Sequence, residues 1–371
     1  MTEVITNADI FREIETWAPK QLAYDWDHVG LQIGSHQQKV KKVLISLDVL
    51  ESVVDEAIEL GVDLIIAHHP LLFKPLKKID VNTPQGRTVA KLIKHEISVY
   101  AAHTNLDIAE GGVNDLLCQK LQIKTTDHVV PVTEERLYKL KVFVPLDHAR
   151  EVRDAISQAG AGHIGNYSHC TFQTKGQGTF KPLQGTNPYI GKIDEVEYVD
   201  EYKIETIVQE SILAKVIQAM IEAHPYEEVA YDIFPLHQTG KSYGLGRIGQ
   251  LPNQMTVEQL ALQVKQVFSL DHVRVIGKHD KNINQVAVIG GSGEKYIHAA
   301  KMKGADVLIT GDMTFHQAQI AKDIGLVVID AGHYIEEVMK EAMQAKLAST
   351  FSNHSVEFII SKVNTNPFTC L

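Results

Sequence analysis

Two adjacent histidines, His68 and His69, are the first candidates for chemistry in this chain. They follow the apolar run DLIIA and are followed at once by Pro70. Functional sites in parallel α/β sheets gather at the carboxyl ends of strands, and neighbouring strand residues point to opposite faces. Two adjacent imidazoles cannot easily bind one ion, but they can reach two ions lying about 3.5–4 Å apart. The alternative is a pair of core or capping histidines.

Two further histidines are each followed by a carboxylate four residues later. His333 precedes Glu337, and His103 precedes Asp107 in the string HTNLD. Residues four apart on a helix share one face, and this combination suits zinc, iron or manganese. The alternatives are a solvated helix face with a weak ion pair and, for Asp107, a helix cap.

Other polar features carry weaker signals. Asp312 and His316 follow another predicted strand and can lie near the same site, although a helix N-cap near Asp312 explains this segment equally well. The string GSGEK lacks the phosphate-loop pattern GxxxxGK[ST]. The string GLGRIG is typical of a tight loop, in which Arg247 can meet an anion.

The elements that must position these residues alternate between strand and helix. In the first part of the chain the expected strands are Val43–Leu47, Leu64–Ala67 and Ser98–Ala102, and the expected helices are Leu50–Leu60, Thr88–His95 and Gly112–Lys120. In the last part the strands are Val286–Gly290, Val307–Thr310, Val327–Asp330 and Val356–Ile360, and the helices are Glu294–Lys303, Phe315–Ile324 and Tyr334–Leu347. This order predicts right-handed crossovers and parallel sheets.

The two parts look like copies of one another. Placing Val43 over Val286 superimposes Gly61 on Gly304 without a gap. A difference in the length of the loop that follows is then needed to bring YAAH (100–103) over DAGH (330–333). His103 and Asp107 thereby fall on His333 and Glu337. Matching element order and matching polar pairs together indicate a duplication.

Between the two parts the pattern changes. Tyr138–Val144, Val196–Val199, Lys203–Val208 and Val229–Ile233 are expected strands, and His148–Ala159 and Ile212–Ala223 are expected helices. The glycine-rich stretch GAGHIGNYSHCTFQTKGQGTF is expected to be irregular. This order fits a ferredoxin-like insert. We therefore predict an α/β protein with a duplicated main domain (residues 1–130 and 237–371) and an inserted domain at 131–236, where a loop from Pro235 leads back.

Composition restricts the class of protein. Hydrophobic residues make up 44% and charged residues 22%, close to the globular average. The three cysteines, Cys118, Cys170 and Cys370, form no CxxC pair and are expected to be reduced thiols. The first residues do not have the pattern of a signal peptide, and no apolar run approaches the ~18 residues of a membrane span. A net charge of −10 without a Lys/Arg cluster argues against nucleic acid as a partner. We expect a cytoplasmic protein.

Five strings in the chain carry a family resemblance. They are DWDHVGLQIG (25–34), AHHP (67–70), AAHTNLD (101–107), HPYEEVAYDI (224–233) and AGHYIEE (331–337). Together they resemble the Nif-three-like family, whose members are often labelled GTP cyclohydrolase I type II homologues, and the match covers nearly the whole chain. In the first string this chain has His28 where the family usually shows asparagine.

The resemblance has specific implications. It implies binding of two divalent metal ions by His68, His69, Asp107, His333 and Glu337, with Asp107 between the ions, and His103 is a further expected contributor. It implies a ring-shaped homohexamer. It also implies a middle domain similar to PII and CutA proteins.

Three functions compete at this point. The first is a metal-dependent hydrolase acting on a nucleotide or related small molecule. The second is a non-enzymatic metallochaperone or regulatory protein whose PII-like insert senses a ligand. The third is an interaction scaffold with a structural metal. Zinc is the first choice of metal, with iron or manganese as alternatives, and the sequence identifies neither a substrate nor a general acid or base.

Overall fold

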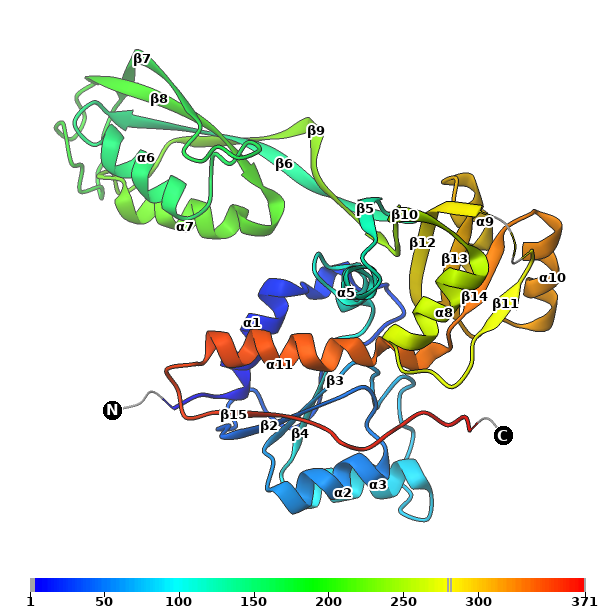
Figure 1. Cartoon of the computed structure of the whole chain (residues 1–371). Coiled ribbons are helices and arrows are strands. Elements are labelled where there is room, and N and C mark those ends of the chain that lie inside the picture. The colour runs from blue at the N-terminus through cyan, green and yellow to red at the C-terminus, as the bar shows by residue number, and fades with distance from the viewer. Residues whose placement is uncertain (1–3, 279, 281, 370–371) are drawn as a thin grey trace. The chain divides into compact units, whose positions relative to one another are not determined.

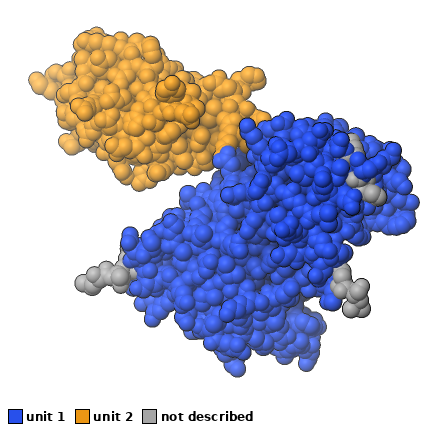
Figure 2. Space-filling view, viewed as in Figure 1, with its two compact units in different colours: residues 1–132, 243–371 blue, residues 133–242 orange. Residues whose placement is uncertain are grey.

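The structure is a computed structural model that describes residues 4–278, 280 and 282–369 (Figure 1). The chain divides into two compact units, Met1–Val132 with Tyr243–Leu371, and Thr133–Ser242 (Figure 2). The second unit extends beyond the expected end at 236, because strand β9 (Tyr231–Leu245) runs through Pro235. Since β9 is the last strand of its sheet, a residue without a backbone N–H is tolerated there.

The first unit contains two sheets and the helices that cover them. One sheet has the order β1 (Gly30–Ile33), β4 (Ser98–Ala101), β3 (Leu64–Ala67), β2 (Lys42–Ser46), β15 (Glu357–Ile360). The other has the order β11 (Arg274–Ile276), β14 (Val327–Asp330), β13 (Val307–Gly311), β12 (Asn282–Ser292), β10 (Arg247–Thr256), β5 (Lys124–Asp127). The helices are α1 (Asn7–Trp17), α2 (Glu51–Leu60), α3 (Pro84–Lys94), α4 (Thr104–Ile108), α5 (Val113–Lys120), α8 (Val257–Val267), α9 (Ile297–Met302), α10 (Phe315–Asp323) and α11 (Val338–Thr350), with short 3₁₀ turns η1 (Lys20–Leu22), η3 (Glu294–Tyr296) and η4 (His333–Glu337).

The parallel strands form the centre of each sheet, as their apolar sequences require. β2, β3 and β4 are mutually parallel, and so are β12, β13 and β14. Every residue of β3, β4, β13 and β14 is buried. Strands that are covered on both faces are expected to read as continuous apolar runs, which is why these segments were recognisable in the sequence.

The duplication is visible in the topology and in individual hydrogen bonds. The order β1-β4-β3-β2 repeats as β11-β14-β13-β12, with an antiparallel first strand in both cases. The Asp63 carboxylate accepts hydrogen bonds from the backbone N–H groups of Lys41 and Lys42. Its counterpart in the second half, Asp306, accepts the same pair from the backbone at positions 284 and 285. The predicted duplicated α/β fold is therefore confirmed.

The two halves exchange their last strands. β15 comes from the C-terminal part but pairs in parallel with β2 (red beside blue in Figure 1). β5 follows α5 in the first part but pairs with β10 of the other sheet. We expected Val356–Ile360 to belong with the second half, and this was wrong. One apolar core contains residues from both halves, so the two halves form a single folded unit.

The second unit has the β-α-β-β-α-β order of a ferredoxin-like fold. Its elements are β6 (Val130–Pro145), α6 (Ala149–Gln158), β7 (Thr171–Phe180), β8 (Glu197–Gln209), η2 (Glu210–Ile212), α7 (Leu213–Ala223) and β9, and the strand order is β7-β8-β6-β9. Two details correct the expectation. β7 lies in the glycine-rich stretch that we expected to be irregular, and β8 is one strand where we expected two.

One of the two glycines of β7 lies close to a side chain of the neighbouring strand. A Cβ at Gly178 would lie 2.3 Å from a carboxylate oxygen of Glu201 on β8, whereas a Cβ at Gly176 would meet nothing within 4 Å. A larger residue at position 178 would therefore displace the Glu201 side chain. The two glycines suggested a loop, yet they lie in an edge strand.

Three other expectations concern single residues and the membrane. Arg247 meets an anion, but it is the internal carboxylate of Asp115, at 2.7 and 2.8 Å. Cys118 and Cys170 carry free thiols, and Cys370 lies outside the described residues. Among the residues that the structure describes, no helix is both long enough and apolar enough to cross a bilayer.

Candidate metal centre

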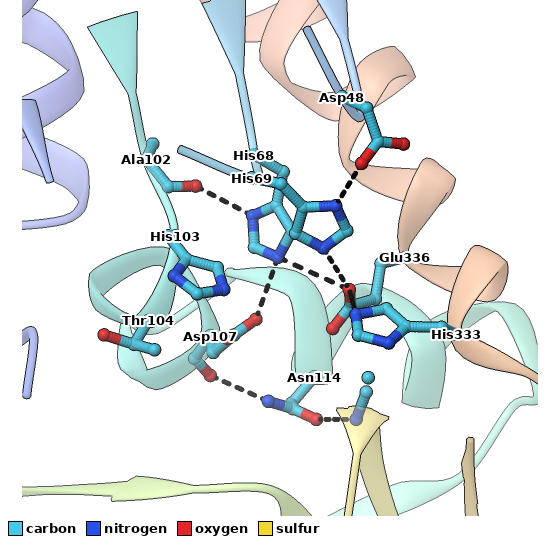
Figure 3. Close-up of polar contacts among 12 residues, drawn as sticks. Asp48, His68, His69, Ala102, His103, Thr104, Asp107, Asn114, His333 and Glu336 are labelled. Carbon is cyan, nitrogen blue, oxygen red and sulfur yellow. Dashed lines mark hydrogen bonds and ion pairs between the residues drawn. The ribbon is translucent and has the colours of Figure 1, made fainter. Parts of the chain in front are cut away.

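The polar residues singled out by their spacing lie where parallel strands end. His68 and His69 follow the end of β3, and His103 follows the end of β4. His333 begins the 3₁₀ turn η4, shortly after β14 of the other sheet. Figure 3 shows the imidazoles of His68, His69 and His333 gathered at the Glu336 carboxylate, with Asp107 beside them. The cluster thus contains residues from both halves of the duplicated domain.

The rings of His68 and His69 are oriented through their Nδ1 atoms. The Nδ1–H of His68 donates to the carbonyl oxygen of Ala102 at 2.8 Å, and that of His69 donates to Oδ1 of Asp48 at 2.7 Å. A histidine whose Nδ1–H is occupied presents its Nε2 lone pair to a ligand. In both residues, therefore, Nε2 is the atom that faces the centre.

His103 and His333 follow the same rule. The Nδ1–H of His103 donates to Oδ1 of Asp27 at 3.0 Å, and that of His333 donates to Oδ2 of Asp312 at 2.7 Å. Metal-binding histidines typically donate their other N–H to a carboxylate or a carbonyl. All four histidines of the cluster have such a partner.

Two buried carboxylates complete the cluster. Oε2 of Glu336 lies 3.1 Å from Nε2 of His69, 3.2 Å from Nε2 of His333 and 3.7 Å from Nε2 of His68. Oδ1 of Asp107 lies 3.5 Å from Nε2 of His68. The side chains of Glu336 and Asp107 are only 3% and 12% exposed. One carboxylate is therefore shared by three imidazoles, and a second lies on the side of His68.

The structure places Glu336 in the cluster and not Glu337, which our spacing argument had chosen. η4 is a 3₁₀ turn, in which residues three apart lie above one another, so Glu336 stands beside His333. The carboxylate of Glu337 turns away and pairs with Nζ of Lys340 at 2.9 Å. The other five predicted residues, His68, His69, His103, Asp107 and His333, are brought together.

The error has a second cause in the alignment of the two halves. Ala101 at the end of β4 and Asp330 at the end of β14 hold equivalent positions, because each pairs with the matching residue of the neighbouring parallel strand. Our alignment of YAAH with DAGH was therefore shifted by one position. In the corrected alignment the counterpart of Asp107 is Glu336. In that alignment Gly332, with φ of +75°, stands at the position of His103, and His333 follows it.

The cluster can hold cations. Nε2 of His68 and Oδ1 of Asp107 are buried and have no hydrogen-bond partner, and such atoms are rare because leaving them unpaired is costly. The cluster contains three overlapping groups, each with its possible ligand atoms within 4.8 Å of one another: His68, His69 and His103; His69, His333 and Glu336; His68, Asp107 and Glu336. Imidazole and carboxylate donors suit a divalent transition metal.

The electrostatics of the cluster favour positive charge. Burial alone would lower the pKa values of His69 and His333, but hydrogen bonds to carboxylates outweigh it and raise them to about 9 and about 10. Burial raises the pKa of Asp107 to about 6, against the attraction of His68. Glu336 is also buried, yet the surrounding imidazoles hold its pKa well below the usual value. Protonated imidazoles thus balance the negative charge of Glu336 where no other cation does.

Comparison with known proteins places the chain in a family. The family model described as Duf34/NIF3 (NGG1p interacting factor 3) matches residues 5–367. The chain belongs to the DUF34/NIF3 family. A Bacillus subtilis protein named GTP cyclohydrolase 1 type 2 homolog is 50% identical over 373 residues, covering all of both chains. A Staphylococcus aureus protein of the same name is 39% identical and covers 97% of this chain and 98% of its own.

Solved structures of relatives share the fold. A Bacillus cereus protein described as related to NIF3 is 48% identical, covers all of both chains and superimposes with a TM-score of 0.94. A Staphylococcus aureus protein is 34% identical, also over the whole of both chains, with a TM-score of 0.79. These comparisons confirm the family that the five sequence strings indicated.

Several residues of this NIF3-family centre were missed in the sequence. Asp48 follows the end of β2, and the rule that sites gather at carboxyl ends of strands could have found it. Asp312 was noticed, but its contact with His333 was not foreseen, and the N-cap of α10 is Thr314. His316 is exposed and bonds Gln319 at 3.1 Å, outside the three ligand groups.

The centre is open on the side of His69 and His333. These residues, with Asp48 and Asp312, line a cleft of about 1020 Å³ whose walls include residues 268–272 and the C-terminal segment 364–369. Oγ1 of Thr365 in that segment donates to Oδ2 of Asp48 at 2.5 Å. The chain end therefore supports the carboxylate that orients His69.

Proposed function

We propose that this NIF3-family protein is a metal-dependent hydrolase that acts on a nucleotide or a related small molecule. Its centre would hold two divalent cations. The observation that carries the proposal is the convergence of three Nε2 atoms, those of His68, His69 and His333, on the buried Glu336 carboxylate, with Asp107 beside His68. His103 forms a ligand group with His68 and His69, and all four histidines have an occupied Nδ1. The ligands would be His68, His69, His103, Asp107, His333 and Glu336.

The number of cations rests on the overlap of the ligand groups. His68, His69 and Glu336 each belong to two of the three groups, so there is more than one position at which ligand atoms converge. Asp107 is the carboxylate that we expect between the ions, and its unpartnered Oδ1 supports that role. Zinc is our first choice, and iron or manganese would accept the same donors.

The chain itself provides orientation and access. The carboxylates of Asp27, Asp48 and Asp312 fix the ring orientation of three histidines. The cleft beside His69 and His333 has room for a small molecule. Bound divalent ions would lower the pKa of a coordinated water and stabilise negative charge on a substrate oxygen. The name of the relatives, GTP cyclohydrolase 1 type 2 homolog, is the reason to begin with nucleotides.

The test compares His69→Ala with His316→Ala after zinc loading. His316 is an exposed histidine outside the cluster and serves as the matched control. We expect the first variant to lose bound zinc and hydrolysis of nucleotides or phosphoesters, and the second to retain both. Hydrolysis that persists in metal-free protein, or equal zinc content in the two variants, would refute the proposal.

A second function has a specific observation in its favour. Asp27, Asp48 and Asp312 are each committed to a histidine, so they are poorly placed to move a proton during hydrolysis. A metal-holding or regulatory protein with a ligand-sensing insert needs no such group. In that case zinc should bind and exchange readily, and no nucleotide or phosphoester should be turned over.

We also propose the assembly that the family resemblance suggests. The protein would act as a ring-shaped homohexamer in the cytoplasm. Light scattering of the purified protein should then give six times the chain mass of 41.3 kDa. A particle of one or two chains would contradict the ring.

A further inference from the structure

Two large aromatic side chains lie exposed beside the candidate metal centre. Trp26 is 54% exposed and Phe73 is 50% exposed, and their ring centroids are 5.8 Å apart at an angle of 61°. Aromatic side chains gain most of their favourable free energy from burial. A contiguous pair left open at the edge of a polar centre therefore indicates a binding surface.

Trp26 is connected to the centre by direct contacts. Its ring meets the ring of His103 edge-on, with centroids 6.2 Å apart and an angle of 74°. The next residue, Asp27, orients His103 through the hydrogen bond to Nδ1 at 3.0 Å. Tyr24 stacks on Trp26, with centroids 5.7 Å apart and an angle of 13°. The Trp26 ring is thus held in place on one side and lies next to a candidate ligand.

The aromatic pair departs from the internal duplication. The string Asp27-His28-Val29 before β1 recurs as Asp271-His272-Val273 before β11, which puts Leu270 at the place of Trp26. Phe73 lies in the connection from β3 to β4, which is longer than the connection from β13 to β14. The first half therefore has an aromatic surface where its copy has a leucine and a shorter loop.

We propose that Trp26, with Phe73 at its edge, is a stacking surface for the planar ring of the substrate. The inference rests on the proposed function, and it narrows the substrate to a phosphorylated planar heterocycle such as a purine nucleotide. The ring would lie on Trp26, which does not line the cleft beside His69 and His333, and the phosphate would reach the cations from the side of His103. Aromatic stacking of this kind is strong and tolerant of the identity of the base.

The chain offers an internal reporter for this contact. It contains two tryptophans, Trp17 and Trp26. Trp17 is engaged elsewhere, since its Nε1 donates to the carbonyl oxygen of Glu110 at 2.9 Å and Nζ of Lys346 lies over its ring. In the Trp17→Phe background, emission therefore reports on Trp26 alone. The probes are guanosine monophosphate and ribose 5-phosphate, which share sugar and phosphate and differ by the ring.

We expect guanosine monophosphate to quench Trp26 emission of the zinc-loaded protein with saturation, and ribose 5-phosphate not to. By calorimetry, Trp26→Ala should weaken guanosine monophosphate binding about tenfold, a typical effect of losing one stacked base, and leave ribose 5-phosphate binding unchanged. Trp26→Phe should restore part of the loss. Tyr167→Ala, at an aromatic that is 76% exposed in the inserted unit, should change neither affinity.

Three results would overturn the inference. The first is a Trp26→Ala variant with intact affinity for guanosine monophosphate. The second is a variant that binds both probes equally weakly, which would mean that Trp26 acts only through His103. The third is dissociation of an oligomer by the same substitution in light scattering, which would make the aromatic pair a contact between copies.

Binding of the two probes to the wild-type protein tests the stacking surface separately from the proposed hydrolase function. Equal binding of the two probes would contradict the stacking surface but not the hydrolase function. If the protein bound neither probe, both the stacking surface and the hydrolase function would be contradicted.

Discussion

Nε2 of His69 lies 3.1 Å from Oε2 of Glu336, although the two residues are 267 positions apart in the chain. The first residue follows β3 of one sheet, and the second lies in η4, after β14 of the other. The contact therefore exists only when the two halves of the duplicated domain are folded together.

The position of the second carboxylate is tested by neighbouring substitutions. Glu336→Gln should reduce bound zinc to one ion per chain or fewer, because three imidazoles share this carboxylate. Glu337→Gln should keep the wild-type content, because Glu337 pairs with Lys340. Elemental analysis of both variants is the measurement. If the two lost zinc to the same extent, our assignment would be wrong.

The carboxylates that orient the histidines should increase the affinity of the centre for metal ions. Asp48→Asn keeps the shape of the side chain but weakens the charge-assisted hydrogen bond to His69. Loss of such a partner typically lowers metal affinity about 10–100-fold. Competition with a chelating dye would measure it. Asp55→Asn is the control, since Asp55 is half exposed and pairs with Lys91, and an equal loss there would count against the orienting role.

Metal loading should release protons. The pKa values of His69 and His333 in the metal-free centre are about 9 and about 10, so near neutral pH both rings are positively charged and carry a proton on Nε2 as well as on Nδ1. A metal ion needs the neutral ring, and affinity should therefore rise with pH, about tenfold per unit for each proton displaced. Calorimetry in two buffers of different ionisation enthalpy counts the protons. Zinc binding with no proton release would contradict these raised pKa values.

The pairing of β15 with β2 predicts which strand should exchange its amide hydrogens faster when β15 is disrupted. The backbone N–H groups of Glu357 and Ser361 donate to the carbonyl oxygens of Lys41 and Ile45, at and within β2. Ile359 lies midway between them, so its backbone N–H points toward β2 as well. Ile359→Pro removes that donor. Hydrogen exchange should then increase in β2 and not in β12, and Ile359→Val should leave both unchanged. Faster exchange in β12 alone would contradict the observed pairing.

Much of the fold could be predicted because buried parallel strands are short, continuous and apolar. Leu64–Ala67 and Val327–Asp330 were located to the residue, since nothing polar interrupts them. The sequence contains no comparable signal for strand exchange, because β15 has the same composition whichever sheet it joins. β7 was missed because its two glycines, Gly176 and Gly178, are residues typical of loops.

The candidate site could be predicted in part. His68 and His69 stand out because they end a buried strand, and the repeat drew attention to His333. The choice between Glu336 and Glu337 depended on whether η4 is an α-helical or a 3₁₀ turn and on a shift of one position in the alignment of the halves. Neither can be read from the periodicity of so short a segment.

Crystals of the protein loaded with zinc, measured at the zinc absorption edge, test the central claim most directly. We predict two anomalous peaks about 3.5–4 Å apart, enclosed by the six side chains proposed as ligands, including Glu336. No peak at this centre, or zinc bound only elsewhere on the surface, would contradict the account.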